Sequence, residues 1–436
     1  MRRRAYGATR VNDVDVVQLT QGKEGLGLTV GCDMGKHKAL IACRWADGQF
    51  ARPWRMDNPS EIGDLVALLE RLRKGRQLVM AMESSGTYGD ALRQALADAQ
   101  IPLQRVSTKA SHDYAEIFDG VPSQHDGKDA AVIAELAGLG KSVPWPYRAM
   151  DTWEQELAYW VDWMVSQRQI LTMWQGRLEG LLARHWPEAT RVLKLSSATL
   201  LKVLNHYGSP QALASDAEAA ARLARWGGKF LNAGKIARLL AEARASKGVR
   251  AGPWQQRQIQ DFAGQALQAR QQGKRAQRRL LVLARGHEVL QAQAKAVGVP
   301  TACVLWVNTG DPRKFHAAAA YRKALGLNLV ERSSGEHVGE LHISKRGSAR
   351  SRQWLYFAVL RLVQKAGVRP WYEAKKARHA DAAKKALIAL MRKLALALYQ
   401  IAVHQETFDA RRLFARIVSR CETAPVSAQT EIGVEA

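Results

Sequence analysis

Apolar and polar positions alternate with a short period in the first part of the chain, which favours strands. Residues 26–32 and 39–44 are two such runs, separated by Met34-Gly35-Lys36-His37 in a pattern typical of a β-hairpin. The following patterns predict, in order, a helix over 61–73, a buried strand over 78–82, a helix over 88–99, a strand over 101–106 and a helix that begins near His125. Antiparallel strands followed by strand–helix alternation predict a mixed α/β sheet with helices on its faces.

From Trp153 onward the apolar residues recur in alternating steps of three and four, which is typical of a long coiled-coil helix. One series comprises Leu157, Trp160, Met164, Gln167, Leu171, Trp174, Leu178 and Leu181, and another comprises Ile259, Phe262, Ala266, Ala269, Gly273, Ala276, Leu280 and Leu283. The middle of the second series consists of small residues, which leave room for the bulky side chains of the first series. We therefore expect the two helices to form an antiparallel coiled-coil hairpin. Turn signals within 187–253 predict a small insertion of short helices at its tip.

These patterns divide the chain into five regions. We expect a polar leader over 1–24, an α/β domain over 25–148, a coiled-coil hairpin over 149–295 with its insertion over about 187–253, a mainly α-helical domain over 296–420 and a disordered tail over 421–436. The fold class is therefore an α/β domain followed by a long α-helical coiled-coil region and a second, helical domain.

The charge balance of the chain is strongly basic. Lys and Arg total 65 against 40 Asp and Glu, a net charge of +25 that calls for a polyanionic partner, with nucleic acid as the first candidate. No membrane is expected, because the most apolar late stretch carries Arg392 and Lys393 at its middle. The opening Met1-Arg2-Arg3-Arg4 lacks the apolar core of a secretory signal, so we expect a cytoplasmic protein. Four scattered cysteines favour buried thiols over disulfides or a zinc site.

Four carboxylates are candidates for metal-dependent chemistry. Asp33 and Glu83 each follow an apolar strand, whereas Asp126 and Asp129 stand three apart at the start of a helix, on one face of its first turn. Four hard oxygen ligands suit Mg²⁺ or Mn²⁺, which can activate a nucleophile and stabilise a leaving oxygen in phosphoryl transfer. The alternative for the helical pair is capping and dipole matching. Four other acids are expected to be solvated surface: Asp13, Asp15, Asp57 and Asp90.

Hydroxyls beside glycines in a cation-rich stretch form a second candidate region. Ser334 lies within Arg332-Ser333-Ser334-Gly335, and either Ser334 or its neighbour Ser333 could be a nucleophile. Nearby cations would then bind phosphates: Lys345, Arg346, Arg350 and Arg352. A turn or cap is the alternative for such serines. The basic series Lys274, Arg275, Arg278 and Arg279 either tracks phosphates or forms a solvated helix face.

Three short motifs resemble the N-terminal domain of the DEDD transposases of the insertion sequence 110 (IS110) family. They are Gly31-Cys32-Asp33, then Met82-Glu83-Ser84-Ser85-Gly86-Thr87-Tyr88, then Asp126-Gly127-Lys128-Asp129-Ala130. Farther on, the order of Leu325-Gly326-Leu327, Ser334-Gly335, Ile343-Ser344-Lys345-Arg346-Gly347 and Met391-Arg392-Lys393-Leu394-Ala395 resembles that family's C-terminal transposase domain.

The resemblance implies an RNase H-like, RuvC-type domain in which Asp33, Glu83, Asp126 and Asp129 hold magnesium, and a second domain whose Ser334 becomes covalently linked to DNA. It further implies that the two parts meet across subunits, that the coiled coil helps to assemble dimers into a tetramer, and that a structured noncoding bridge RNA pairs with target and donor DNA. The excess of positive charge would then hold both RNA and DNA backbones.

Two other functions remain as alternatives. A RuvC-like Holliday-junction or structure-specific nuclease would use water as the nucleophile and leave Ser334 structural. A nucleic-acid-binding scaffold would carry the same basic surfaces with an inactive catalytic site.

Overall fold

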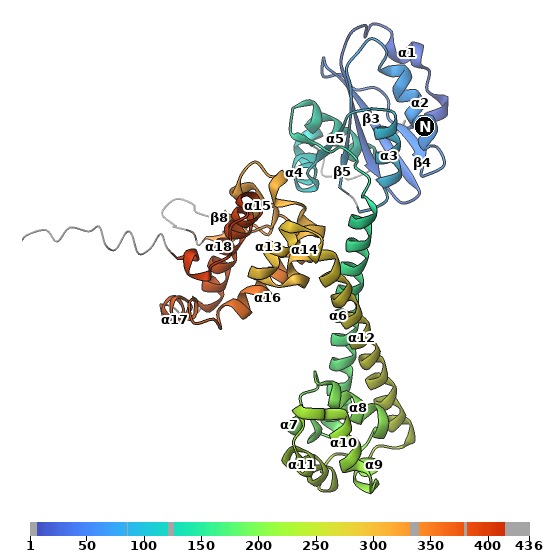
Figure 1. Cartoon of the computed structure of the whole chain (residues 1–436). Coiled ribbons are helices and arrows are strands. Elements are labelled where there is room, and N and C mark those ends of the chain that lie inside the picture. The colour runs from blue at the N-terminus through green and yellow to red at the C-terminus, as the bar shows by residue number, and fades with distance from the viewer. Residues whose placement is uncertain are drawn as a thin grey trace, which may run out of the picture. The chain divides into compact units, whose positions relative to one another are not determined.

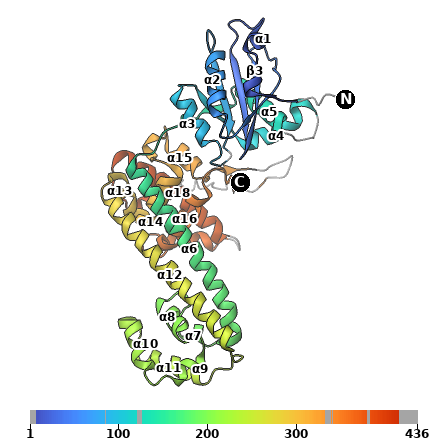
Figure 2. The same ribbon diagram turned by 90° about the vertical axis from the view of Figure 1, so that its right-hand side faces the viewer.

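The structure is a computed structural model that describes residues 7–84, 86–120, 126–331, 339, 341–378 and 382–414 (Figures 1 and 2). The chain divides into two compact units, Met1–Ala149 and Met150–Ala436. Each unit is built on its own clusters of buried apolar residues. The tail expected over 421–436 lies outside the described residues.

The first unit contains a mixed sheet. In its described part, seven strands follow the order β1-β4-β3-β2-β5-β6-β7. They are β1 (Thr9–Arg10), β2 (Leu28–Met34), β3 (Lys38–Trp45), β4 (Trp54–Asp57), β5 (Leu78–Glu83), β6 (Leu103–Val106) and β7 (Ser142–Pro144). Strand β2 pairs antiparallel with β3 and parallel with β5, which in turn runs parallel to β6. The predicted hairpin and mixed α/β sheet are confirmed.

Helices cover both faces of this sheet. Apolar side chains of β2 and β5 alternate, so that Val30, Cys32 and Met80 pack into one cluster with α2 (Ile62–Leu72) and α3 (Asp90–Asp98). The other face receives α5 (Asp126–Gly138), whose Ile133 packs with Ala81 of β5, and α4 (Thr108–Asp119) contributes Ala115 to the same cluster. The catalytic candidates Asp33 and Glu83 belong to this second face by the alternation of side chains.

Small residues let α5 lie unusually close to β2. A Cβ atom on Gly31 would stand 2.2 Å from the carbonyl oxygen of Ala130 and 2.4 Å from the amide nitrogen of Ala134. These are backbone atoms of α5, which cannot move aside as a flexible side chain can. Glycine at position 31 is therefore a condition for the position of α5 over β2.

The stretch expected to be a polar leader is part of this unit. Thr9 and Arg10 form β1, which pairs parallel with β4 at the edge of the sheet. Val11 is buried in the apolar cluster, and the short helix α1 (Val16–Thr20) is capped by the Asp15 carboxylate, which accepts hydrogen bonds from two backbone amides.

Two long helices, α6 (Thr152–His185) and α12 (Pro253–Arg285), run side by side in the second unit (Figures 1 and 2). Leu157 near the start of α6 shares a buried cluster with Leu280 near the end of α12, whereas Leu178 near the end of α6 shares one with Ile259. This pairing is antiparallel, as the predicted hairpin requires. Supercoiling of the two helices stays a prediction.

Short helices connect α6 to α12, within the range expected for the insertion. They are α7 (Ala189–Val192), α8 (Ala198–Tyr207), α9 (Pro210–Ser215), α10 (Ala219–Gly227) and α11 (Ala233–Arg244). Leu204 and Leu239 are buried in a cluster that also receives Leu182 of α6 and Ala263 of α12. The insertion therefore shares its core with the far end of the long helices.

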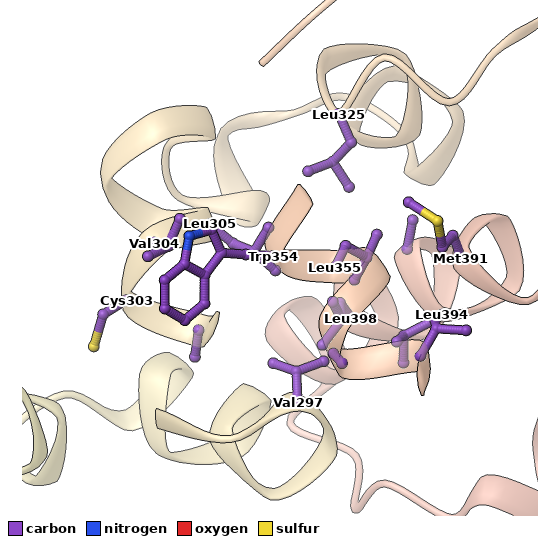
Figure 3. Packing of buried hydrophobic residues seen from close by; sticks show 14 of the residues in the cluster. Val297, Cys303, Val304, Leu305, Leu325, Trp354, Leu355, Met391, Leu394 and Leu398 are labelled. Atoms are coloured by element: carbon purple, nitrogen blue, oxygen red, sulfur yellow. The ribbon is translucent and has the colours of Figure 1, made fainter. Parts of the chain in front are cut away.

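The remaining helices of the second unit are α13 (Glu288–Val297), α14 (Val299–Thr309), α15 (Ala318–Ala324), α16 (Ala349–Leu362), α17 (Arg369–Lys376) and α18 (Ala382–His404). Most of them pack against α18, whereas α14 packs on α13, α16 and the long helices. Figure 3 shows Leu394 and Leu398 of α18 facing Leu355 of α16 and Val297 of α13. In the described residues, α18 is the one helix long and apolar enough to cross a membrane by composition alone. Half of its apolar window is buried inside the second unit, and Leu390, Leu394 and Leu398 belong to the apolar core there.

Candidate catalytic centre and basic groove

Asp33 and Glu83 lie next to each other at the carboxyl ends of two parallel strands. Cys32 of β2 pairs with Met82 of β5, so the following residues, Asp33 and Glu83, are cross-strand neighbours. Both residues are half-buried and follow Gly31 and Ala81 by two positions, which puts their side chains on the α5 face. The sequence predicted strand ends for both residues, and the structure brings the two strand ends together.

Helix α5 points its first turn at this edge. At the opposite end of the sheet, Arg44, which pairs with Thr29 at the start of β2, makes an ion pair with Glu135 late in α5. At the Asp33 end, Leu40 packs beside Ala130 and its neighbours early in α5. Helix α5 therefore runs antiparallel to β2 and begins near the end of that strand.

The third and fourth carboxylates belong to that first turn. Asp129 is half-buried, one turn before the buried Ile133, and so shares the sheet-facing side of α5. Asp126 begins the helix, but its side chain lies outside the described residues. Between them, Lys128 is 1% exposed and makes a 2.5 Å ion pair with Asp119 at the end of α4, which ties the first turn of α5 to the neighbouring helix.

The donor chemistry of this edge suits a divalent cation. Asp33, Glu83 and Asp129 offer only carboxylate oxygens, which are the ligands that Mg²⁺ and Mn²⁺ prefer. Among the described side chains, no three His, Cys, Asp or Glu residues stand close enough to form a metal site. Cys32 is no rival ligand: burial, and then the charge of Asp33, raise the pKa of its thiol, and its side chain packs on the opposite face.

The four acids expected to be surface residues have local structural roles or ion-pair partners. Asp15 caps α1, and Asp13 lies in the first turn of a 3-10 helix. Asp57 pairs with Arg10 at 3.2 Å, and Asp90 with Arg93 at 2.9 Å. The three cysteines among the described residues, Cys32, Cys43 and Cys303, are free and buried, whereas Cys421 lies outside them.

The candidate nucleophile Ser334, like Ser333, lies outside the described residues. The chain on either side is described: β8 (Leu329–Val330) pairs antiparallel with β9 (His342–Ile343). Both strands line a groove of about 990 Å³ on the second unit. Four cations also line this groove: Lys345, Lys375, Lys385 and Arg392.

Only part of the predicted basic set lines the groove. Lys345 does so, but Arg350 makes an ion pair with Asp162 of α6. Arg352 donates a 3.0 Å hydrogen bond to the carbonyl oxygen of Gly347. Arg346 follows Lys345 in the same exposed turn, and its amide donates a weak 3.4 Å hydrogen bond to the Ser344 hydroxyl. Of the four cations predicted to bind phosphates, Lys345 thus lines the groove, whereas Arg350 and Arg352 have partners within the protein.

Arg392 is the cation that the sequence gave least reason to choose, because it sits inside the apolar run of α18. Burial, and then the charge of Arg322 on α15, lower the pKa of its guanidinium. The Nε atoms of Arg392 and Arg322 are both buried, and neither has a hydrogen-bond partner among the described residues. Two neighbouring guanidinium groups with unused donors favour a bound anion. The pair Arg392-Lys393, which interrupts the apolar run of this helix, was the signal that could have revealed this feature.

Comparisons with known proteins agree with this architecture. Residues 30–187, which contain Asp33, Glu83, Asp126 and Asp129, match a DEDD transposase family of the IS110 type. Residues 287–375, which contain Ser334 and Lys345, match the family described as "Transposase IS116/IS110/IS902 family". The chain is also 24% identical to the "Insertion element IS110 uncharacterized 43.6 kDa protein" of Streptomyces coelicolor, over 81% of this chain and 89% of that protein.

The first match covers most of the first unit and continues through α6, whereas the second lies within the second unit; their order is the one that the sequence motifs predicted. A DEDD transposase domain implies a general dependence on divalent metal ions, and a transposase acts on DNA. The mixed sheet with its α5 face fits an RNase H-like domain of this kind. The chain therefore belongs to the IS110 family of transposases and is a DNA transposase, an enzyme that recombines DNA.

Proposed function

We propose that this transposase cuts and rejoins DNA through a covalent link to Ser334, with Mg²⁺ or Mn²⁺ held by Asp33, Glu83, Asp126 and Asp129. The observation that carries the proposal is the neighbouring placement of Asp33 and Glu83 at one sheet edge, with the first turn of α5 directed at that edge. Because α5 carries the other two carboxylates, one packing arrangement can supply all four donors.

The proposed first step is a phosphoryl transfer to serine. The Ser334 hydroxyl oxygen attacks a DNA phosphorus and forms an O–P ester bond, while the bond from phosphorus to one sugar oxygen breaks. The serine proton passes to a base, and the leaving sugar oxygen takes up a proton. In the second step a sugar hydroxyl of another strand attacks the phosphoserine and releases the serine. Divalent metal ions at the carboxylates would stabilise the charge that develops on the phosphate and the leaving oxygen.

The basic groove supports a role for the serine segment in holding DNA. Its strands β8 and β9 flank the segment that contains Ser334, and Lys345, Lys375 and Arg392 supply positive charge along the groove. Arg392 lines the groove, and its Nε has no hydrogen-bond partner among the described residues, so its guanidinium would be available to a phosphate. A phosphate bound here would hold the DNA backbone next to the serine segment.

Serine variants test the nucleophile. Ser334→Ala should lose strand exchange and the covalent protein–DNA adduct, which gel electrophoresis under denaturing conditions detects with labelled DNA. Ser333→Ala is the matched control and should keep both. An adduct that persists in Ser334→Ala and disappears in Ser333→Ala would move the assignment to Ser333. Hydrolysed ends without an adduct in the unaltered protein would favour the water-using junction nuclease.

Carboxylate variants test the metal site separately. Asp33→Asn and Glu83→Gln each remove one charge at the sheet edge and should abolish cleavage in Mg²⁺ or Mn²⁺. Asp90→Asn is the control, because Asp90 lies in the same unit with Arg93 as its partner. Cleavage that survives Asp33→Asn would contradict the assignment. Absence of cleavage in the unaltered protein with either metal would favour the inactive scaffold.

We also propose that a structured noncoding RNA guides this transposase to its target and donor DNA in the bacterial cytoplasm, at the nucleoid. The net charge of +25 is large enough to serve both an RNA and a DNA partner. Sequencing of RNA that copurifies with the protein tests the proposal. A discrete RNA encoded beside the gene supports guidance, whereas bulk cellular RNA alone contradicts it.

A homo-oligomer, from dimer to tetramer, is the proposed active form. In α6 a second apolar series faces solvent within the unit, with Tyr159 at 56% exposure, Trp163 at 37%, Ile170 at 37% and Met173 at 43%. These residues keep the heptad spacing of the buried series, as a helix does when it packs against two partners. Light scattering of the unaltered protein and of Ile170→Glu tests this role. A monomer in both would contradict it.

A further inference from the structure

A cavity of about 410 Å³ opens between α6 and α12, halfway along the pair of long helices. Trp354 of α16 closes one side of it. The cavity lies within the second unit and is distinct from the groove beside β8 and β9, since no lining residue is shared between them. We call it the hairpin notch.

Small residues of α12 produce the notch. Ala269 and Gly273 face Gln167 of α6, and a Cβ atom on Gly273 would stand 3.7 Å from the Cβ atom of Gln167. Gln167 is a buried polar residue in an otherwise largely apolar contact surface. The long helices therefore leave an opening at the level where large apolar side chains would have closed the contact.

Three cations surround this opening: Arg168, Arg270 and Lys274. In the part of the chain that the structure describes, none of them lies within ion-pair distance of a carboxylate. The sequence explains why: no Asp or Glu occurs between Asp162 and Glu179 on α6, or between Asp261 and Glu288 from α12 onward. The middle of the hairpin is thus a region of uncompensated positive charge.

Two of these cations are held in place by neighbours other than carboxylates. Arg270 donates a 2.7 Å hydrogen bond from Nη1 to the carbonyl oxygen of Ser196, and its Nε is buried with no partner among the described residues. The Arg168 guanidinium lies over the rings of Phe357, at 4.3 Å, and Trp354, at 5.3 Å. Both guanidinium groups are already held in position, so an anion that binds here causes little further loss of side-chain conformational entropy.

We propose that the hairpin notch binds a nucleic-acid backbone, with one phosphate among Arg168, Arg270 and Lys274 and the attached sugar against Gln175 and Gln277. The site would be a second anchor for nucleic acid, separate from the transfer chemistry. It depends neither on Ser334 as the nucleophile nor on RNA guidance, so it can fail while the proposed function stands. The shared ligand chemistry is the sugar–phosphate backbone, in DNA or in RNA.

Salt-dependent binding of the full-length protein tests the notch. Lys274→Gln removes one exposed cation at its rim and should make the plot of log affinity against log salt less steep, by about 0.9 for duplex DNA or about 0.7 for single-stranded RNA. The control is Lys202→Gln, an equal charge change at an exposed lysine of α8. Random-sequence duplex DNA and single-stranded RNA are the probes, titrated separately.

A second pair of variants adds a negative charge and leaves the three cations of the notch in place. Gln277→Glu places a carboxylate at the notch rim and should weaken binding, whereas Gln258→Glu makes the same change at an exposed position near the start of α12. A smaller slope with DNA alone, or with RNA alone, supports the site and identifies its ligand. Equal slopes for Lys274→Gln and Lys202→Gln with both probes, together with unaltered binding by Gln277→Glu, would overturn the proposal.

Discussion

Gly31→Ala is expected to disturb the first unit more than any ordinary addition of one methyl group. The new Cβ atom would meet two backbone atoms of α5 at 2.2 and 2.4 Å, so α5 or β2 must shift by about 1 Å or more to restore normal contact. Overpacking of a core costs roughly 1–3 kcal/mol, and a backbone clash belongs at the upper end. A loss of about 3 kcal/mol lowers the melting temperature of a unit this size by roughly 6–12 °C.

Hydrogen–deuterium exchange measures this effect locally. Amides of β2 and α5 should lose protection in Gly31→Ala, while those of α6 and α12 keep theirs. The control is Gly63→Ala in the exposed first turn of α2, where a Cβ would meet nothing within 4 Å. That variant should match or exceed the parent's stability, by up to about 1 kcal/mol. Unchanged protection of α5 in Gly31→Ala would refute the proposed close contact and its role in placing Asp129 near Asp33.

Three further predictions concern charged groups of the second unit. Arg392→Gln should keep or raise the melting temperature, because it removes a partly buried charge beside Arg322, yet weaken DNA binding; a large fall in melting temperature would contradict this. Arg350→Gln should change DNA affinity little and stability by less than about 1 kcal/mol, because Arg350 already pairs with Asp162 on the surface; a steep loss of affinity in a filter-binding assay would contradict it. Burial, and then the charge of Arg313, lower the pKa of His287 in the folded protein. The neutral imidazole should therefore contribute fully to folding stability above the unfolded pKa of about 6.5, and this contribution should be lost as pH falls through the lower folded pKa. His287→Gln should flatten that part of the stability curve measured by thermal unfolding.

The sequence predicted the elements whose apolar pattern is strong. The hairpin of β2 and β3, the buried strand β5 and the two long helices all carry several apolar residues at one period, and burial rewards that pattern directly. Strand β4 and helix α4 were missed. Trp54 and Met56 alternate with polar residues over only four positions, and α4 buries only Ser111 and Ala115, so neither presents a long apolar series.

The candidate site divides in the same way. Asp33 and Glu83 could be found because each ends an apolar strand, and a parallel register then brings strand ends together. The internal partners of Arg350 and Arg352 could not be found, because Asp162 and Gly347 become neighbours only through the packing of helices and turns. Sequence spacing shows where cations are numerous, but it does not show which of them are already neutralised.

The closeness of α5 to the sheet connects the packing of the first unit to its chemistry. Gly31, Ala42 and Ala81 form a layer of small residues under Ala130, Ala131 and Ile133, and this layer brings the axis of α5 toward the sheet. Since Asp33 and Glu83 follow Gly31 and Ala81 by two positions, the same layer sets the distance from their carboxylates to the first turn of α5. Larger side chains in this layer would raise α5 and separate the proposed metal ligands without altering any of them. Loss of metal-dependent cleavage by such variants, with Asp33 and Glu83 intact, would therefore be a packing effect on the proposed catalytic centre.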